Sequence, residues 1–197
     1  MSDAIRVVKA STHKPKPKDA ELGFGNVFTD HMFVADFQEE KGWYDPRVEP
    51  YGVLPLDPAA AVLHYAQAVF DGLKAFRGVD GKIRLFRPQK HVERLNNSAR
   101  HMCIPPLDPE LALRSLVTLV GIEREWVPKA IGTSLYIRPT IIASELGYHA
   151  VGISPRMRPG PASTTATSLL PELATYKVFP SRSSASASGL EPTCAPA

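Results

Sequence analysis

The stretch HYAQAVFDGLKAFRG, residues 64–78, decides the fold of this chain. An Asp-Pro pair at 57–58 supplies a helix cap and a first helical residue, and Gly72 suits the left-handed turn that ends a helix. We therefore predict a helix that begins at this pair and stops at Gly72. Alternating residues at 73–77, a VDGK turn and a returning strand at 83–87 then predict a β-hairpin.

Further elements lie on both sides of this stretch. We expect strands at 31–38 and 134–144 and helices at 88–102 and 110–127. Between 43 and 58, four prolines restrict regular structure to short extended pieces. Pro139 removes a backbone donor from the last strand, which fits an edge position or a bulge. The pattern predicts a small α/β domain.

Composition narrows the class of protein. The 197 residues carry a net charge of +3, with 44% hydrophobic and 22% charged residues, as expected of a soluble globular protein. The basic residues are dispersed, which argues against nucleic acid as a partner, and no apolar run is long enough to cross a bilayer. Two distant cysteines and the absence of a signal or transit pattern predict a cytoplasmic protein without disulfides or a zinc site.

Both ends of the chain differ in composition from its centre. Residues 1–22, with the run KPKPKD, predict a flexible, solvated lead-in. From 146 to 197 no helical or alternating period persists, and Pro, Ser, Ala and Thr supply more than half of the residues from 151 onward. Such a composition buries too little apolar surface to offset backbone entropy. We therefore predict a disordered or loosely attached low-complexity tail.

Five side chains between the two ends could carry chemistry. Arg94 could hold an anionic group bidentately, or could simply face solvent from its helix. Tyr136 and Arg138 share one strand face and could recognise a carboxylate, although a structural ion pair is an equal alternative. Tyr65 and Phe70 could be ordinary core residues. We find no glycine-rich phosphate loop and no metal or nucleophile constellation.

Four runs resemble branched-chain amino-acid aminotransferases: FTDHM (28–32), HYAQAVFDGLKAFRGVDGKIRLFRP (64–88), HVERLNNSA (91–99) and SLYIRPTIIASE (134–145). The resemblance extends from 23 to 145. It implies the smaller, N-terminal domain of the class IV (D-amino-acid aminotransferase-like) fold, an α/β domain of the two-layer α+β kind. Members of this family use pyridoxal 5′-phosphate and work as homodimers or larger assemblies.

The resemblance also implies a reaction and its site residues. The reaction is the transamination of leucine, isoleucine or valine with 2-oxoglutarate, so the partners are small amino acids and 2-oxo acids. Arg94 matches the arginine that binds the cofactor's phosphate. The implied substrate-binding residues are Phe24, Phe70, Tyr136 and Arg138, together with Tyr65, which would reach the neighbouring subunit's pocket.

The chain departs from the family at its catalytic lysine, which lies in a second domain and binds the cofactor covalently. Lys177 is the only lysine after Lys129, and its context, LATYKVFPSR, does not resemble the family's lysine segment. We therefore assign no catalytic residue and expect little or no activity from this chain. We interpret residues after about 145 as out of frame or truncated, a hypothesis that the other two reading frames of the coding DNA would test.

Two alternatives remain open at this point. The chain could be a non-enzymatic fragment that only associates with a full-length subunit. It could also derive from another class IV enzyme, such as a D-amino-acid aminotransferase or an aminodeoxychorismate lyase.

Overall fold

The computed structural model describes residues 4–23, 25–145 and 165–175. In the described chain, the helices are α1 (Ala61–Tyr65), α2 (Pro88–His101) and α3 (Pro109–Ile122), with 3-10 turns at Asp19–Glu21 and Arg124–Trp126. The strands are β1 (Arg6–Val7), β2 (His31–Gln38), β3 (Gly42–Pro50), β4 (Ala68–Phe70), β5 (Leu73–Arg77), β6 (Ile83–Leu85), β7 (Thr133–Ala143) and β8 (Thr165–Thr175). No described helix is long and apolar enough to cross a membrane.

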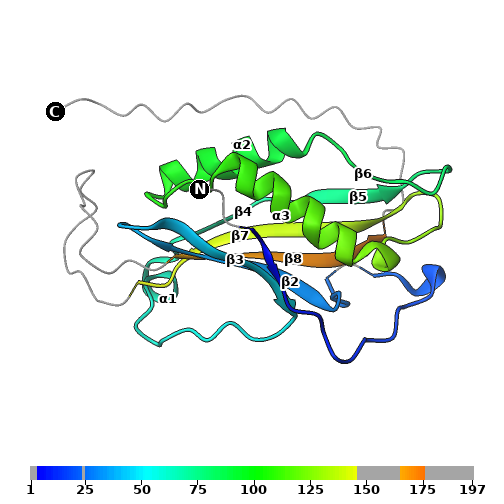
Figure 1. Cartoon of the computed structure of the whole chain (residues 1–197), viewed down its shortest axis with the longest axis horizontal. Coiled ribbons are helices and arrows are strands. Elements are labelled where there is room, and N and C mark those ends of the chain that lie inside the picture. Colours follow the sequence, from blue (N-terminus) through cyan, green and yellow to red (C-terminus); the bar gives the residue numbers. More distant parts are fainter. Residues whose placement is uncertain (1–3, 24, 146–164, 176–197) are drawn as a thin grey trace, which may run out of the picture.

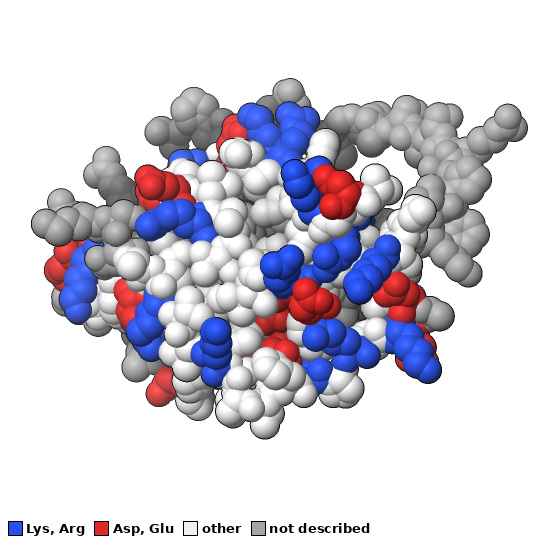
Figure 2. Space-filling view, turned by 45° about the vertical axis from the view of Figure 1, so that its right-hand side comes forward, with Lys and Arg blue, Asp and Glu red and all other residues white. Residues whose placement is uncertain are grey.

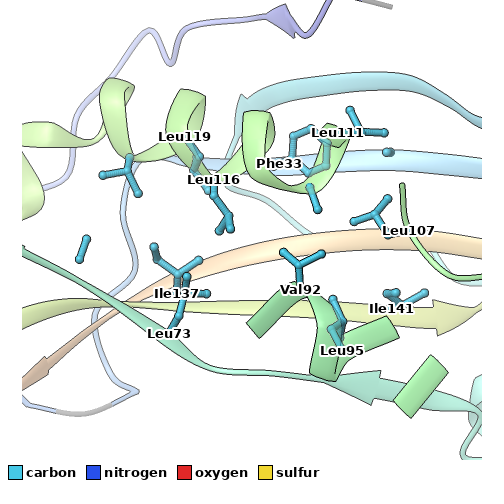
Figure 3. Close-up of a cluster of buried hydrophobic side chains, with 14 of the residues drawn as sticks. Phe33, Leu73, Val92, Leu95, Leu107, Leu111, Leu116, Leu119, Ile137 and Ile141 are labelled. Atoms are coloured by element: carbon cyan, nitrogen blue, oxygen red, sulfur yellow. The ribbon is translucent and has the colours of Figure 1, made fainter. Parts of the chain in front are cut away.

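The strands form one sheet in the order β1-β3-β2-β8-β7-β5-β6, with β4 paired to β7 beside β5. Helices α2 and α3 lie together on one face of this sheet (Figure 1). The hydrophobic core fills the space between the two layers (Figure 3). There Leu95 of α2 and Leu116 of α3 belong to the same buried cluster as the sheet residues Leu73 and Ile137. The two-layer α/β architecture is therefore as predicted.

Most predicted elements are confirmed. Strands β2 and β7, helices α2 and α3 and the hairpin of β5 and β6 lie within two residues of their predicted bounds, apart from the early end of α3. Asp108 caps α3 as expected, because its carboxylate accepts a hydrogen bond from the Leu111 amide at 2.7 Å. Helix α3 ends at Ile122, and the rest of its predicted length forms the turn Arg124–Trp126.

The helix predicted from the Asp57-Pro58 pair to Gly72 is wrong at both ends, because only residues 61–65 are helical and Ala60, not Asp57, is the N-cap. Helix α1 spans five residues and stops at Ala66, whose φ of 51° is left-handed. The chain then forms β4, in which Val69 is buried and pairs with Ile141 of β7, so backbone pairing overrides local helix propensity. Gly72 does not have the positive φ that the predicted helix end requires. A Cβ at this position would lie 1.8 Å from the Tyr136 hydroxyl, so a glycine is needed because the Tyr136 side chain lies against the backbone.

The prolines also behave differently from the prediction. The region beginning at 43 contains a nine-residue strand, β3, which tolerates Pro46 because the register shifts there and Asp45 adopts a φ of 45°. Pro139 does not occupy an edge, because β7 lies between β8 and the pair β4 and β5. It faces the interruption between β4 and β5, where its carbonyl accepts the Asp71 amide at 2.9 Å.

Most of the N-terminal lead-in is exposed, and several hydrogen bonds attach it to the domain. Strand β1 pairs in parallel with β3. The Ala10 amide donates to Nε2 of His31 at 2.8 Å, and the Lys14 amide donates to Oδ1 of Asp30 at 2.9 Å. Asp30 is buried and also accepts from the Trp126 indole at 3.1 Å. A buried carboxylate and imidazole therefore hold this segment in place.

The predicted tail contains a strand. Strand β8 pairs with β7 along its whole length, from Thr133↔Thr175 to Ala143↔Thr165, and with β2 from Phe33↔Leu169 to Phe37↔Thr165. For these eleven residues the expectation of irregular structure is wrong, because backbone pairing on two sides compensates for a weak side-chain pattern. Residues 146–164 and 176–197, with Lys177, lie outside the described residues, so the suspected change of frame stays a prediction.

Candidate functional site

Strand β7 presents two different faces, as its alternation predicts. Leu135, Ile137 and Ile141 are fully buried against the helices. Tyr136, Arg138 and Thr140, which share the opposite face, are only partly buried. This second face of the sheet is the candidate site.

Arg138 lies between two aromatic rings on this face. Its guanidinium carbon is 4.6 Å from the centre of the Phe70 ring and 5.1 Å from that of Tyr136. Phe70 reaches the same face because it pairs with Thr140 across β4 and β7, and 63% of its surface is exposed. Cation–π contacts of this kind favour a fixed, charged guanidinium.

Among the side chains that the structure describes, which do not include those of β8, Arg138 has no ion-pair or hydrogen-bond partner, and its Nε is buried. The structural ion pair considered from sequence is therefore not found in the described part of the chain. The Arg138 guanidinium can therefore donate hydrogen bonds to a ligand carboxylate, while the exposed Phe70 ring beside it can contact an apolar group of the same ligand.

Arg94 projects from α2 and is paired with Asp71. Its Nε donates to Oδ2 at 2.7 Å and its Nη2 to Oδ1 at 2.5 Å. The hydrogen bonds and charge of Asp71 raise the pKa of Arg94, which stays protonated. The side chain is nevertheless 66% exposed, and its Nη1 makes no hydrogen bond to a side chain or backbone group that the structure describes. Asp71 thus binds one side of the Arg94 guanidinium, and the other side remains exposed to solvent.

Asp71 is the buried anchor of this pair. Its Oδ1 also accepts the Gly72 amide at 2.5 Å and lies 3.1 Å from Nδ1 of His91. Burial alone would raise the pKa of Asp71, but the hydrogen bonds from Arg94, His91 and Gly72 outweigh burial and leave the pKa below its ordinary value. The carboxylate is therefore ionised at neutral pH.

A groove of about 650 Å³ lies beside this pair and is lined by Gly72, Leu73, Lys74, Phe76, Arg84, Leu85, Phe86 and His91. Lys74 faces the candidate site because it pairs with Tyr136 across β5 and β7. Burial lowers the pKa of Lys74. Sequence reasoning did not single out Lys74, Asp71 or His91. The alternation of β5 placed Lys74 apart from its buried neighbours, but only the strand register places it opposite Tyr136.

The structure brings some of the sequence-predicted site residues together. Arg138 contacts both Phe70 and Tyr136. Asp71 connects this group to Arg94, because its amide bonds to the Pro139 carbonyl while its carboxylate binds the Arg94 guanidinium. Tyr65 ends α1 and is 49% exposed. Phe24 lies outside the described residues.

The surface shows no segregation of charge on the face drawn in Figure 2, where lysine and arginine side chains alternate with aspartate and glutamate. A continuous basic stripe is the usual footprint of a nucleic-acid-binding protein. The visible face does not have one. Within the described chain, charged side chains form local pairs such as Arg84 with Asp80, 2.7 Å apart.

Comparison with known proteins identifies relatives for about three quarters of the chain. It is 57% identical over 141 residues to branched-chain-amino-acid aminotransferase 2 of Bacillus subtilis, covering 72% of this chain and 39% of that protein. It is 53% identical over 145 residues to branched-chain-amino-acid transaminase 1 of the same organism, covering 74% and 41%. The chain thus spans about two fifths of the length of the curated relatives it matches. No protein-family model matches it.

A solved structure supports the fold. The branched-chain amino acid aminotransferase of Thermobaculum terrenum, in its PLP-form, superposes with a TM-score of 0.51 at 16% identity, covering 77% of this chain and 41% of that one. The fold expected from the resemblance, the N-terminal part of a class IV aminotransferase, is confirmed. Over the matched residues, the chain is a homologue of the branched-chain amino-acid aminotransferases.

Proposed function

We propose that the matched residues form one wall of the active site of a branched-chain amino-acid aminotransferase. This wall binds the phosphate of pyridoxal 5′-phosphate and the carboxylate of leucine, isoleucine or valine. Transamination requires further residues, including a lysine, from a second domain. The observation that carries the proposal is Arg138, which is held between Phe70 and Tyr136 with no anionic partner among the described residues.

The residues present fit the cofactor's phosphate. Arg94 is permanently charged, and its Nη1 side is directed away from the carboxylate that holds Nε and Nη2. A guanidinium suits a phosphate dianion because it offers parallel donors in a plane. When bound, pyridoxal phosphate supplies an electron sink for charge that develops on the amino acid. The contribution of this chain is to hold and orient.

The substrate end of the wall combines charge with apolar surface. Arg138 would bind the carboxylate, which restricts rotation of the amino acid. Phe70, the more exposed of its two ring neighbours, would contact the branched side chain. One methylene in such a pocket changes specificity by about 1–3 kcal/mol. The arrangement therefore favours leucine over alanine.

A complementation assay tests this proposal. The 197-residue chain is mixed with a polypeptide containing the C-terminal three fifths of the Bacillus subtilis relative, pyridoxal phosphate, leucine and 2-oxoglutarate. We expect glutamate formation from the mixture and little from either part. Arg138→Gln should lower kcat/KM for leucine by about 30-fold or more, as truncation of a charge pair does.

The matched control is Arg6→Gln, which removes an arginine already paired with Asp45 at the opposite edge of the sheet. Equal losses in Arg6→Gln and Arg138→Gln, or no loss in Arg138→Gln, would refute the assignment of Arg138. A mixture that transaminates D-amino acids but not leucine would favour another class IV activity.

Association with a full-length subunit is a second candidate function. Leu63 and Tyr65 of α1 are 58% and 49% exposed, so this short helix offers apolar surface to a partner chain. Family members are expected to be homodimers, which makes a full-length copy the natural partner. Co-purification with the full-length relative, without restored activity and weakened by Tyr65→Ser, would support this function over the enzymatic one.

A further inference from the structure

The pair of Arg94 and Asp71 has a geometry that goes beyond charge neutralisation. A guanidinium has two bidentate edges: a side edge of Nε and one Nη, and an end edge of both Nη atoms. Asp71 occupies the side edge of Arg94, with distances of 2.7 Å and 2.5 Å. Only the end edge, with Nη1, remains for a ligand. Asp71 therefore decides the direction from which an anion can be bound.

Asp71 is itself fixed, although Arg94 is exposed. The carboxylate is 1% exposed, whereas the arginine side chain is 66% exposed. The Gly72 amide and His91 hold Oδ1, and the Asp71 amide is bonded to the carbonyl of Pro139 in the centre of the sheet. An exposed surface arginine is thereby connected to β7, a central strand of the sheet.

We propose that Asp71 is a positioning residue that fixes the end edge of Arg94 for the cofactor's phosphate, with His91 and the Gly72 amide orienting Asp71. This inference rests on the function proposed above. A long, exposed arginine side chain has many rotamers, and an anion that binds it must otherwise restrict them. Asp71 restricts them before the ligand arrives, as preorganisation requires.

Charge and positioning predict opposite results for Asp71→Asn, which makes the test decisive. The substitution removes a negative charge beside a phosphate site, so Coulomb attraction alone would strengthen phosphate binding. Positioning predicts weaker binding, because an amide has a single acceptor oxygen and cannot accept Nε and Nη2 on two separate atoms as the carboxylate does. The matched control is Asp80→Asn, which removes the same charge from the bidentate pair of Asp80 with Arg84 on the hairpin.

The test measures the affinity of the full chain for pyridoxamine 5′-phosphate and for pyridoxamine, neither of which carries an aldehyde that reacts with lysines. The ratio of the two affinities reports recognition of the phosphate. We expect Asp71→Asn to lower this ratio by roughly 5- to 30-fold, the equivalent of losing the ordering of one arginine side chain. Asp80→Asn should leave the ratio unchanged, and Arg94→Gln should abolish the preference.

The outcomes separate this inference from the proposed function. A wild-type chain with no phosphate preference, or a preference that survives Arg94→Gln, overturns phosphate binding at this wall and the positioning role with it. A preference that depends on Arg94 but is unchanged or stronger in Asp71→Asn overturns only the positioning role.

A measurement on the wild-type chain applies even where Asp71→Asn fails to fold. The Nε–H of Arg94 is bonded to Asp71, whereas Arg84 contacts Asp80 through Nη1 and Nη2. In ¹⁵N spectra of arginine side chains, the Arg94 Nε–H should therefore exchange with water more slowly than that of Arg84. Equal exchange rates would contradict a fixed side edge.

Discussion

Replacing Gly72 by alanine tests how closely the Tyr136 side chain packs against the backbone at Gly72. The three heavy atoms nearest to a Cβ at this position all belong to Tyr136: the hydroxyl at 1.8 Å, Cζ at 2.5 Å and Cε2 at 3.0 Å. The backbone of Gly72 has no positive φ, so alanine adds steric conflict without backbone strain. Any cost therefore measures the displacement of the Tyr136 ring.

The expected magnitude follows from this geometry. Overpacking of a filled site costs about 1–3 kcal/mol, and a conflict with a ring carbon as well as the hydroxyl belongs at the upper end. Tyr136→Phe should not rescue the variant, because Cζ remains. Tyr136→Ala should rescue it. In that background Gly72→Ala becomes neutral or stabilising by about 0.4–1 kcal/mol through loss of entropy in the unfolded chain.

Urea unfolding of the four proteins of this double-mutant cycle gives the interaction energy directly. Gly121→Ala is the matched control, because a Cβ at this position of α3 would meet nothing within 4 Å. It should stabilise the chain by up to about 1 kcal/mol. Equal effects of Gly72→Ala in the wild-type chain and in the Tyr136→Ala variant would refute the close-approach explanation of Gly72.

Two further predictions concern buried polar groups outside the site. Burial would raise the pKa of Asp30, but hydrogen bonds from Lys14, His13 and Trp126 outweigh burial and lower it. The ionised Asp30 therefore contributes its full stabilisation at pH values above 3.8, the ordinary pKa of an aspartate. This stabilisation decreases as the pH falls through the lower pKa of the folded state. Urea unfolding should therefore find Asp30→Asn destabilised at pH 7, with the difference from wild type narrowing below about pH 4. A constant difference across this range would contradict the ionised carboxylate. Asn96 satisfies both backbone groups of buried Leu107, with distances of 2.7 Å and 2.9 Å, so Asn96→Ala should cost about 2–4 kcal/mol, whereas the exposed neighbour Asn97→Ala should cost little.

Much of the fold is predictable from the sequence because local pattern and tertiary environment agree. The alternation of residues in β7 is enough to separate Ile137 from Tyr136 and Arg138, and Asp108 marks the start of α3. The failures occur where long-range pairing overrides local preference. Residues 68–70 lie inside the predicted helix but pair with β7, and residues 165–175 form a strand because they pair with β2 and β7. The role of Asp71 could not be predicted from the sequence, because it depends on a contact with Arg94, 23 residues away, that no local sequence pattern indicates.

The placement of β8 has a consequence for how the sheet assembles. In the described structure, β8 alone pairs with both β2 and β7, and it joins Phe33 to Leu169. During synthesis β2 is made long before β8, so the edge of β2 that pairs with β8 stays unpaired until β8 has been made. Such high contact order slows folding and prolongs the exposure of strand edges to other chains. Closing the sheet should thus be a late event in folding, and the interval before it is when this chain is most vulnerable to aggregation.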